Sequence, residues 1–241
     1  MTELTCVETG SGGNCYCVHD GKHILILDCG KKVIWNQIMG ACDYQIKDID
    51  AVLYSHRHLD HFGKETNFYR FGIPMFGHPD TGIHVTGLAE KAIVFLPGKW
   101  KVIPWSVPHT SHDGSPCPCY AYYIQSPSGH RMVYMTDFLY SPVTFKNMKV
   151  NTILIAANHD DDIESEGNSA KYDHVVRGHS KISTVVEILR QNKTSELRNV
   201  ILCHLSATNA TPMKMLTAVY EAVGLDVNVH VATPMTVFNL D

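Results

Sequence analysis

The chain has 241 residues, of which 44% are apolar and 18% are charged, a composition that excludes a disordered or fibrous protein. Its formal net charge of −4 argues against a broad nucleic-acid-binding surface, because phosphate binding recruits a surplus of lysine and arginine. The N-terminus has no basic segment followed by an apolar one, and no apolar run reaches the roughly 18 residues of a membrane span. We therefore expect a cytoplasmic protein in which residues 1–241 form a single domain.

The spacing of apolar residues predicts the elements in chain order. Short strands are predicted over 4–8, 15–19, 23–27, 51–54, 74–76, 93–95, 100–107, 120–125, 131–136, 152–156, 200–203 and 227–231, with a last extended segment near Val237. Helices are predicted over 33–39, 180–191 and 212–223, the last with Pro212 at its start and Gly224 just past its end. Strands come first and are later mixed with helices, which indicates two packed sheets with helices outside.

Cysteine and histidine are both frequent, with 8 and 15 residues. The cysteines include two C-x-C pairs, 15 with 17 and 117 with 119, whose spacing is tighter than the C-x-x-C of a zinc knuckle. We interpret these pairs as alternating strand positions and all eight cysteines as reduced thiols. Histidine is the commonest metal ligand in proteins, so the spacing of the histidines needs closer attention.

The strongest chemical signal is His56-x-His58-x-Asp60-His61, directly after the predicted strand 51–54. Imidazole nitrogens and carboxylate oxygens are good ligands for zinc and similar divalent ions. A loop can direct His56 and His58 one way and Asp60 with His61 another, so one segment can serve two adjacent ions. A buried core would not place these polar groups together without a partner. The motif therefore predicts a metal site.

Further ligands must come from elsewhere in the chain, and three later segments offer them. His112 follows the predicted strand 100–107, Asp137 follows 131–136, and His204 follows 200–203. A strand end is a place where the scaffold holds a side chain rigidly. His109 is a rival of His112 in the same loop.

These residues resemble the metallo-β-lactamase superfamily almost from end to end. The resemblance begins at Ser11-Gly12-Gly13-Asn14, continues through Asp28-x-Gly30, and centres on H-x-H-x-D-H, the defining motif of that superfamily. It implies an α/β fold, a four-layer αββα sandwich, with two divalent metal ions, zinc by preference and manganese as the alternative. By this resemblance the ligands would be His56, His58 and His112 for the first ion, Asp60, His61 and His204 for the second, and Asp137 as the bridge between them. His112 is preferred to His109 because Ser-His-Asp followed by an aromatic strand is more similar to the third motif of the superfamily.

Within the superfamily, the C-terminal third is most similar to the phosphodiesterases related to ribonuclease Z and to WalJ-like exonucleases. The similarity is carried by Asn158-His159-Asp160, then Gly178-His179-Ser180, then His204-Leu205-Ser206. It implies that His179 acts as general acid on the leaving group or stabilises the phosphate, and that Asp60 both binds metal and orients the attacking water. Ala156 departs from this pattern, because the branch often has a carboxylate there that supports the catalytic histidine. This departure argues against a role in tRNA processing, unless Asp160 takes the place of that carboxylate.

The resemblance favours a two-metal phosphodiesterase that hydrolyses nucleotide phosphodiester bonds, with cyclic nucleotides among the candidate substrates. One alternative is an exo- or endonuclease of single-stranded DNA or RNA, and another is a thioester, lactone or β-lactam hydrolase. A non-catalytic binding module is the alternative outside enzymes. The expected partner is a nucleotide or a short single-stranded nucleic acid, with no membrane, and the chain is expected to be a homodimer. Basic residues near the motif could meet a phosphate or be solvated surface: Lys31, Lys32, Arg57, Lys64 and Arg70.

Overall fold

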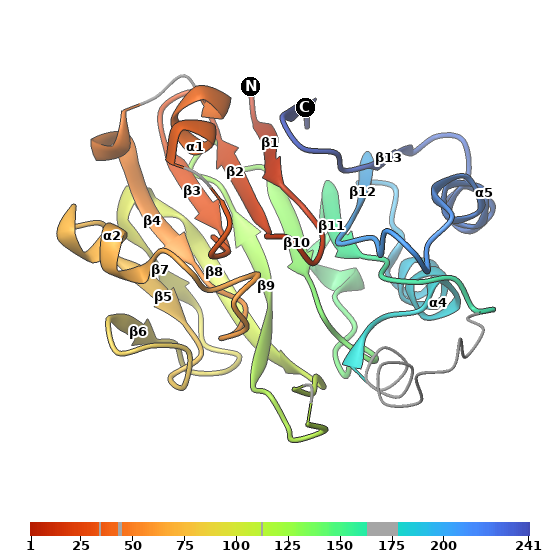
Figure 1. The fold of residues 1–241 in the computed structure, drawn as a ribbon. Coiled ribbons are helices and arrows are strands. Elements are labelled where there is room, and N and C mark those ends of the chain that lie inside the picture. Colours follow the sequence, from red (N-terminus) through yellow and green to blue (C-terminus); the bar gives the residue numbers. More distant parts are fainter. Residues whose placement is uncertain (34, 43–44, 112, 163–177) are drawn as a thin grey trace.

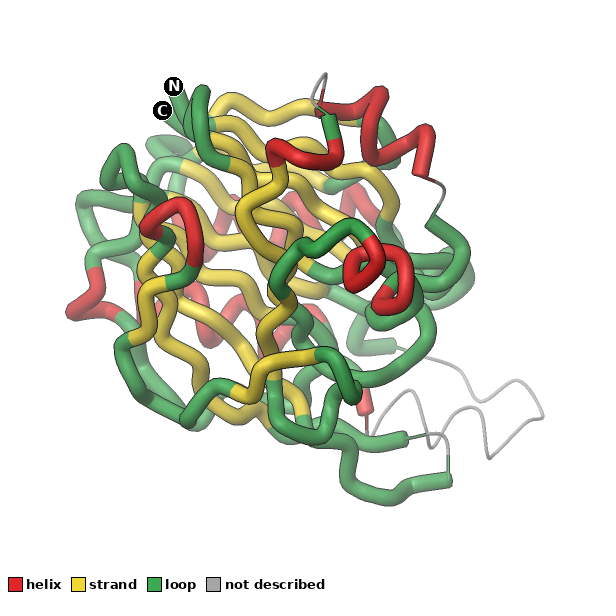
Figure 2. The backbone as a smooth tube through the Cα atoms, turned by 90° about the vertical axis from the view of Figure 1, so that its left-hand side faces the viewer, coloured by secondary structure: helices red, strands yellow, loops and turns green. Residues whose placement is uncertain are grey.

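The computed structural model describes residues 1–33, 35–42, 45–111, 113–162 and 178–241. Within these ranges, two mixed β-sheets of seven strands each pack face to face, and helices cover their outer faces (Figures 1 and 2). Helices α1 (Trp35–Cys42) and α2 (Glu65–Arg70) lie on the first sheet, and α4 (Ile182–Asn192) and α5 (Pro212–Val223) lie on the second (Figure 1). The predicted four-layer αββα sandwich is confirmed.

The first sheet has the strand order β14-β1-β2-β3-β4-β5-β6, so the last strand of the chain pairs with the first. Neighbours from β14 to β3 are antiparallel, and neighbours from β3 to β6 are parallel. Its strands are β1 (Glu3–Glu8), β2 (Cys15–His19), β3 (Ile24–Leu27), β4 (Ile49–Leu53), β5 (Met75–Gly77), β6 (Val85–Gly87) and β14 (Thr236–Asn239).

The second sheet has the order β13-β12-β11-β10-β9-β8-β7. Neighbours from β13 to β10 are parallel, and neighbours from β10 to β7 are antiparallel. Its strands are β7 (Val94–Phe95), β8 (Lys101–Val107), β9 (Cys119–Gln125), β10 (Arg131–Met135), β11 (Thr152–Ala156), β12 (Asn199–Cys203) and β13 (Asn228–Val231). Short 3-10 helices occur at η1 (Ile46–Asp48), η2 (Pro97–Lys99) and η3 (Lys146–Met148).

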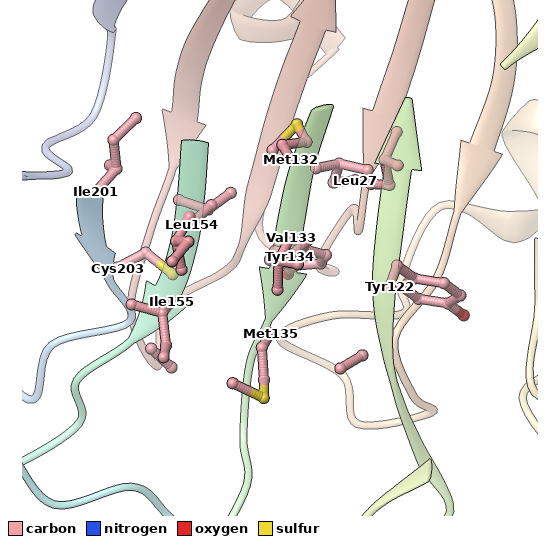
Figure 3. Close-up of a cluster of buried hydrophobic side chains, with 14 of the residues drawn as sticks. Leu27, Tyr122, Met132, Val133, Tyr134, Met135, Leu154, Ile155, Ile201 and Cys203 are labelled. Carbon is pink, nitrogen blue, oxygen red and sulfur yellow. The ribbon is translucent and has the colours of Figure 1, made fainter. Parts of the chain in front are cut away.

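The main hydrophobic core lies between the sheets, because both inner faces are apolar (Figure 3). Strand β2 shows how one strand serves two layers. Tyr16 and Val18 belong to the cluster between the sheets, whereas Cys15 and Cys17 belong to the cluster under α1 and α2, as the period of two in a strand requires. Seven cysteines are described as buried, and none of these belongs to a group suited to metal: Cys6, Cys15, Cys17, Cys29, Cys117, Cys119 and Cys203.

The sheets bring several strand ends to one edge of the sandwich. Because β10, β11 and β12 run parallel, the residues that follow Met135, Ala156 and Cys203 emerge at the same edge. In the first sheet, β3 and β4 are also parallel neighbours, so the segments that follow Leu27 and Leu53 emerge together. Open α/β sheets bind ligands outside the carboxyl ends of such strands.

The sequence predicted the longer elements well and missed short ones. The bounds predicted for β2, β11 and α5 are those observed, whereas α2 and β6 were not predicted. The helix predicted over 180–191 begins at Ile182, because Lys181 has extended backbone and bridges to His159. In the part of the chain that is described, no helix has the length and apolar character needed to span a membrane.

Candidate metal centre

The H-x-H-x-D-H segment follows β4 and lies against the chain that follows β3. The Cys29 N–H donates to the carbonyl oxygen of His61 at 2.8 Å. Beside it, a Cβ atom on Gly30 would lie 2.3 Å from the carbonyl oxygen of Asp60. The position after Cys29 must therefore be glycine, which gives a physical reason for the Asp28-x-Gly30 pattern.

Three polar residues of the site have left-handed backbone just after a strand. Asp28 follows β3 with φ 54°, Asp137 follows β10 with φ 45°, and His204 follows β12 with φ 52°. This conformation is uncommon outside glycine and is typical of strained functional positions. In each case the turn ends the strand and places a buried polar side chain at the shared edge.

The first group suited to metal consists of His56, His58 and His109. The Nδ1 atom of His58 lies 3.0 Å from the Nε2 atom of His109. The ring of His56 lies 4.7 Å from that of His58 and 4.8 Å from that of His109, centre to centre. His56 is completely buried, and its Nε2 atom has no hydrogen-bond partner among the described residues. A buried nitrogen without a partner is costly unless a ligand uses it.

The second group consists of Asp60, His61, Asp137 and His204. The Asp60 Oδ2 atom lies 3.4 Å from His61 Nε2 and 3.2 Å from His204 Nε2. The Asp137 Oδ2 atom lies 2.7 Å from His61 Nε2 and 3.4 Å from His204 Nε2. The same Asp137 oxygen lies 3.7 Å from the Nε2 atom of His56. One carboxylate oxygen therefore faces both groups.

Burial and mutual charge shift the pKa values within the cluster. Burial lowers the pKa of His109 to about 4, and burial together with neighbouring imidazoles lowers the pKa of His56 well below its ordinary value. Burial would also lower the pKa of His61, but Asp60 and Asp137 outweigh it and raise that pKa. Burial would raise the pKa of Asp137, but His204 and His61 outweigh it and keep the carboxyl ionised.

Most imidazoles of the cluster are held by the nitrogen that faces away from it. His61 Nδ1 lies 2.7 Å from Asp28 Oδ2, and His56 Nδ1 lies 3.0 Å from the hydroxyl of Ser55, which itself donates to Asp28. His109 Nδ1 lies 2.6 Å from a backbone carbonyl oxygen, that of Gly178. Such outer contacts fix the tautomer and the orientation of a metal-binding histidine.

Asp28 is the centre of this outer network. Its carboxylate accepts hydrogen bonds from the Ser55 N–H at 2.7 Å, the Ser55 hydroxyl at 2.7 Å and the Tyr134 hydroxyl at 2.5 Å, in addition to the contact with His61. In the sequence, Asp28 stood out only as part of the Asp28-x-Gly30 pattern that resembles the superfamily. An acidic residue that directly follows an apolar strand is the signal that could have drawn attention to it.

His179 and Asn158 contact the other oxygen of Asp137. His179 Nδ1 lies 3.0 Å from Asp137 Oδ1, and the Asn158 amide donates to the same oxygen at 3.3 Å and to the carbonyl oxygen of His204 at 3.1 Å. Ser180 in turn donates to the side-chain oxygen of Asn158 from both its N–H and its hydroxyl. The Asn-His-Asp and Gly-His-Ser segments noted in the sequence are thus joined at the metal centre.

Every predicted site residue that the structure describes belongs to this cluster or contacts it: His56, His58, Asp60, His61, Asp137, His179 and His204. His112 lies outside the described residues. The third imidazole that the structure describes beside His56 and His58 is His109, the rival in the same loop. The sequence offered no local reason to prefer it, because both histidines follow the same strand.

A cavity of about 1100 Å³ opens over the cluster. Its lining includes His58 of the first metal group, residues of the second metal group, and His179. The lining residues are Ser11, Gly12, Lys31, Lys32, Arg57, His58, Leu59, Asp60, Asp137, Asn158, His179, His204, Ser206, Ala207, Thr208 and Asn209. Pockets for small ligands typically have about 300–1,000 Å³, so this one has room for a substrate larger than a single sugar or base.

The residues of the cluster fit divalent metal ions. Their ligand atoms are imidazole nitrogens and carboxylate oxygens, which are the ligands of zinc and of similar ions. The buried His56 Nε2 atom, which has no hydrogen bond among the described residues, lies 3.7 Å from the Asp137 oxygen that both groups approach. The described residues thus hold a cluster suited to divalent metal, as the sequence predicted.

Comparison with known proteins relates the chain to the metallo-β-lactamase superfamily. The model of the metallo-β-lactamase superfamily matches residues 9–64. The probable RNase MJ4 of Methanocaldococcus jannaschii is 31% identical over 108 residues, which cover 42% of this chain and 23% of that protein. The chain thus spans about a quarter of the length of the curated relative it matches.

Two solved structures show the same fold over nearly the whole chain. One is the metallo-β-lactamase fold protein YhfI of Bacillus subtilis, with a TM-score of 0.74, 18% identity and coverage of 98% of both chains. The other is the short form of human tRNase Z, with a TM-score of 0.64, 14% identity and coverage of 99% of both chains. The chain therefore has the metallo-β-lactamase fold, the fold of a superfamily of metal-dependent hydrolases.

Proposed function

We propose that the protein is a two-metal phosphodiesterase that hydrolyses nucleotide phosphodiester bonds, with cyclic nucleotides among the candidate substrates. One observation carries the proposal. Two groups of side chains suited to metal face one carboxylate oxygen, that of Asp137, and residues of both groups line a large cavity together with His179.

The proposed ligands follow from the distances. His56, His58 and His109 would hold the first ion, and Asp60, His61 and His204 would hold the second, with Asp137 in contact with both. His109 takes the place that the resemblance gave to His112, because its Nε2 atom lies 3.0 Å from His58 Nδ1. We expect zinc, with manganese as the alternative.

When bound, two adjacent divalent ions make water more acidic and neutralise negative charge on phosphate oxygens. Side chains of the protein would orient the attacking water and protonate the leaving group. Asp60 would orient the attacking water, since Asp60 lines the cavity and its carboxylate lies beside His204. His179 lines the same cavity and is oriented by its contact with Asp137, so it would protonate the departing oxygen.

The preference for phosphodiesters over other esters rests on two points. The alkoxide that leaves a phosphodiester needs a proton, and His179 lines the cavity and can supply one. Two of the similar proteins also carry RNase in their names, the archaeal relative and human tRNase Z. These similarities support the proposal as analogy.

Hydrolysis by the metal-loaded protein tests the proposal. The panel contains cyclic mononucleotides, dinucleotides, and single-stranded DNA and RNA, with a thioester and a β-lactam as non-phosphate substrates. Asp60→Ala should abolish turnover. Asp226→Ala should not, because Asp226 is an exposed carboxylate that pairs with Lys193 and is far from Asp60 in the sequence. Turnover of only the thioester or the β-lactam would contradict the proposal and move the function to that class.

The main alternative is a nuclease of single-stranded RNA or DNA, which the archaeal relative favours. Cleavage of oligonucleotides with no turnover of cyclic mononucleotides or dinucleotides would establish it. We also propose a homodimer and a single domain over 1–241 in the cytoplasm. A monomeric mass by light scattering would refute the dimer.

A further inference from the structure

The cavity at the metal centre includes basic side chains in its lining. Lys31, Lys32 and Arg57 line it, and the acidic residues that line it, Asp60 and Asp137, both belong to the metal group. The loop after His204 contributes uncharged residues to the lining. Outside the metal group, the charge that this cavity presents to a ligand is therefore positive.

The lysine pair is held at a fixed place relative to the metal ligands. The Lys31 N–H donates to the carbonyl oxygen of Leu59, within the H-x-H-x-D-H loop, at 2.7 Å. The neighbouring Cys29 N–H donates to the carbonyl oxygen of His61. A Cβ atom on Gly63 would lie 2.1 Å from the Lys31 nitrogen, so the two loops are in main-chain contact. The lysines therefore stand on the same rigid unit as the ligands of the second ion.

The three basic residues differ in the groups that already lie near their positive charge. Arg57 already has neighbours of its own: burial raises the pKa of the Cys117 thiol against the opposing charge of Arg57. Hydrogen bonds from Ser115 lower the pKa of the Asp113 carboxyl, with a smaller contribution from Arg57. Lys31 and Lys32 form no ion pair with any residue that the structure describes. Positive groups in a ligand cavity with no internal counter-charge are suited to an anion.

Resting on the proposed function, we propose that the substrate carries a second phosphate beyond the scissile phosphodiester, and that Lys31 and Lys32 bind it. Lysine binds phosphate as a point charge, which tolerates varied ligand geometry. The cavity of about 1100 Å³ has room for both phosphates. A cyclic mononucleotide has a single phosphate, which the metal centre would take, leaving the lysines without a ligand group.

Equilibrium binding tests the second phosphate without requiring turnover. Adenosine 3′,5′-bisphosphate and adenosine 5′-monophosphate are titrated into the metal-loaded protein by calorimetry. We expect the bisphosphate to bind about tenfold more tightly, with the preference falling as salt is raised. Lys31→Gln combined with Lys32→Gln should remove the preference. The matched control is Lys22→Gln with Lys47→Gln, two exposed lysines away from the cavity, which should keep it.

Equal affinity of the two nucleotides in the wild-type protein would overturn the inference. A preference that survives in the Lys31 and Lys32 variant, or that disappears in the control, would overturn it as well. The folded state of each variant is checked by its unfolding midpoint, and Lys31→Arg with Lys32→Arg should retain the preference because the charge is kept.

Turnover separates this inference from the proposed function and identifies the source of the second phosphate. The substrates are a 5′-phosphorylated diadenylate, the unphosphorylated dinucleotide, and an unphosphorylated trinucleotide. Higher kcat/KM through lower KM on the first supports a terminal phosphate, and the same gain on the trinucleotide supports the next phosphodiester of a chain. Hydrolysis of all three at equal kcat/KM would refute the inference and leave the phosphodiesterase standing. Bisphosphate binding that needs the lysines, with no turnover of any phosphodiester, would refute the phosphodiesterase and leave the phosphate-binding role of the lysines standing.

Discussion

Replacement of Asp28 by asparagine should weaken both the fold and the metal centre. The Asp28 side chain is fully buried and accepts hydrogen bonds from Ser55, His61 and Tyr134. Three of these reach the same oxygen, Oδ2. Asparagine keeps the shape, but it has one oxygen in place of two and carries no charge.

The magnitude follows from the geometry. If the amide oxygen of asparagine takes the Oδ2 position, its NH₂ group must face the Ser55 N–H, donor against donor. Removing one partner from a buried charged pair costs about 3–5 kcal/mol, so we expect a loss of that order in the free energy of unfolding. Because Asp28 orients His61 directly and His56 through Ser55, metal affinity should fall by about 10- to 100-fold.

Urea unfolding of the metal-free protein measures the first effect, and competition with a chelator measures the second. Tyr134→Phe is the matched control, because it removes one hydrogen bond to Asp28 and leaves the carboxylate in place. It should cost about 1–2 kcal/mol and change metal affinity much less than Asp28→Asn. Wild-type metal affinity in Asp28→Asn, or an equal loss in both variants, would refute Asp28 as the anchor of the ligands.

Four further outcomes are expected. Gly63→Ala should destabilise the protein by about 3 kcal/mol in urea unfolding, because its Cβ would meet the Lys31 nitrogen at 2.1 Å; a change below the error of the measurement would contradict this packing. His179→Gln should lower kcat by about 10²- to 10⁴-fold while metal content by elemental analysis is retained. Chelation should lower the unfolding midpoint, since an ion that binds only the folded state stabilises it. Burial lowers the pKa of His130. The contribution of neutral His130 to stability is therefore present above the ordinary histidine pKa of about 6.5 and is lost as pH falls below that value. The free energy of unfolding should depend less on pH between pH 7 and 5 in His130→Asn than in the wild type.

The spacing of residues along the chain was enough to predict the fold class and much of the site. His56, His58, Asp60 and His61 lie in one short segment, so their proximity needs no knowledge of the tertiary structure. Helix α5 was predicted with its observed bounds because Pro212 and Gly224 mark its ends locally. Short elements such as α2 were missed, since six residues give too little periodicity to recognise.

Other features depend on contacts between segments far apart in the sequence, and only the tertiary structure decides them. His109 and His112 follow the same strand, and the loop path, which no local pattern encodes, places His109 beside His58. The role of Asp28 arises because β3, β4 and β10 end near one another, so that His61 and Tyr134 meet it from 33 and 106 residues away.

The basic residues near the motif illustrate the same division. The sequence alone left open whether they meet a ligand or lie on solvated surface. The fold puts Lys31 and Lys32 in the lining of the cavity, because main-chain hydrogen bonds join their loop to the metal-binding loop. Lys64 instead donates to the carbonyl oxygen of Lys31, and Arg70 ends the exposed helix α2. Residue type and spacing determined the chemistry of the centre, whereas the pairing of distant strands decided which charged side chains reach it.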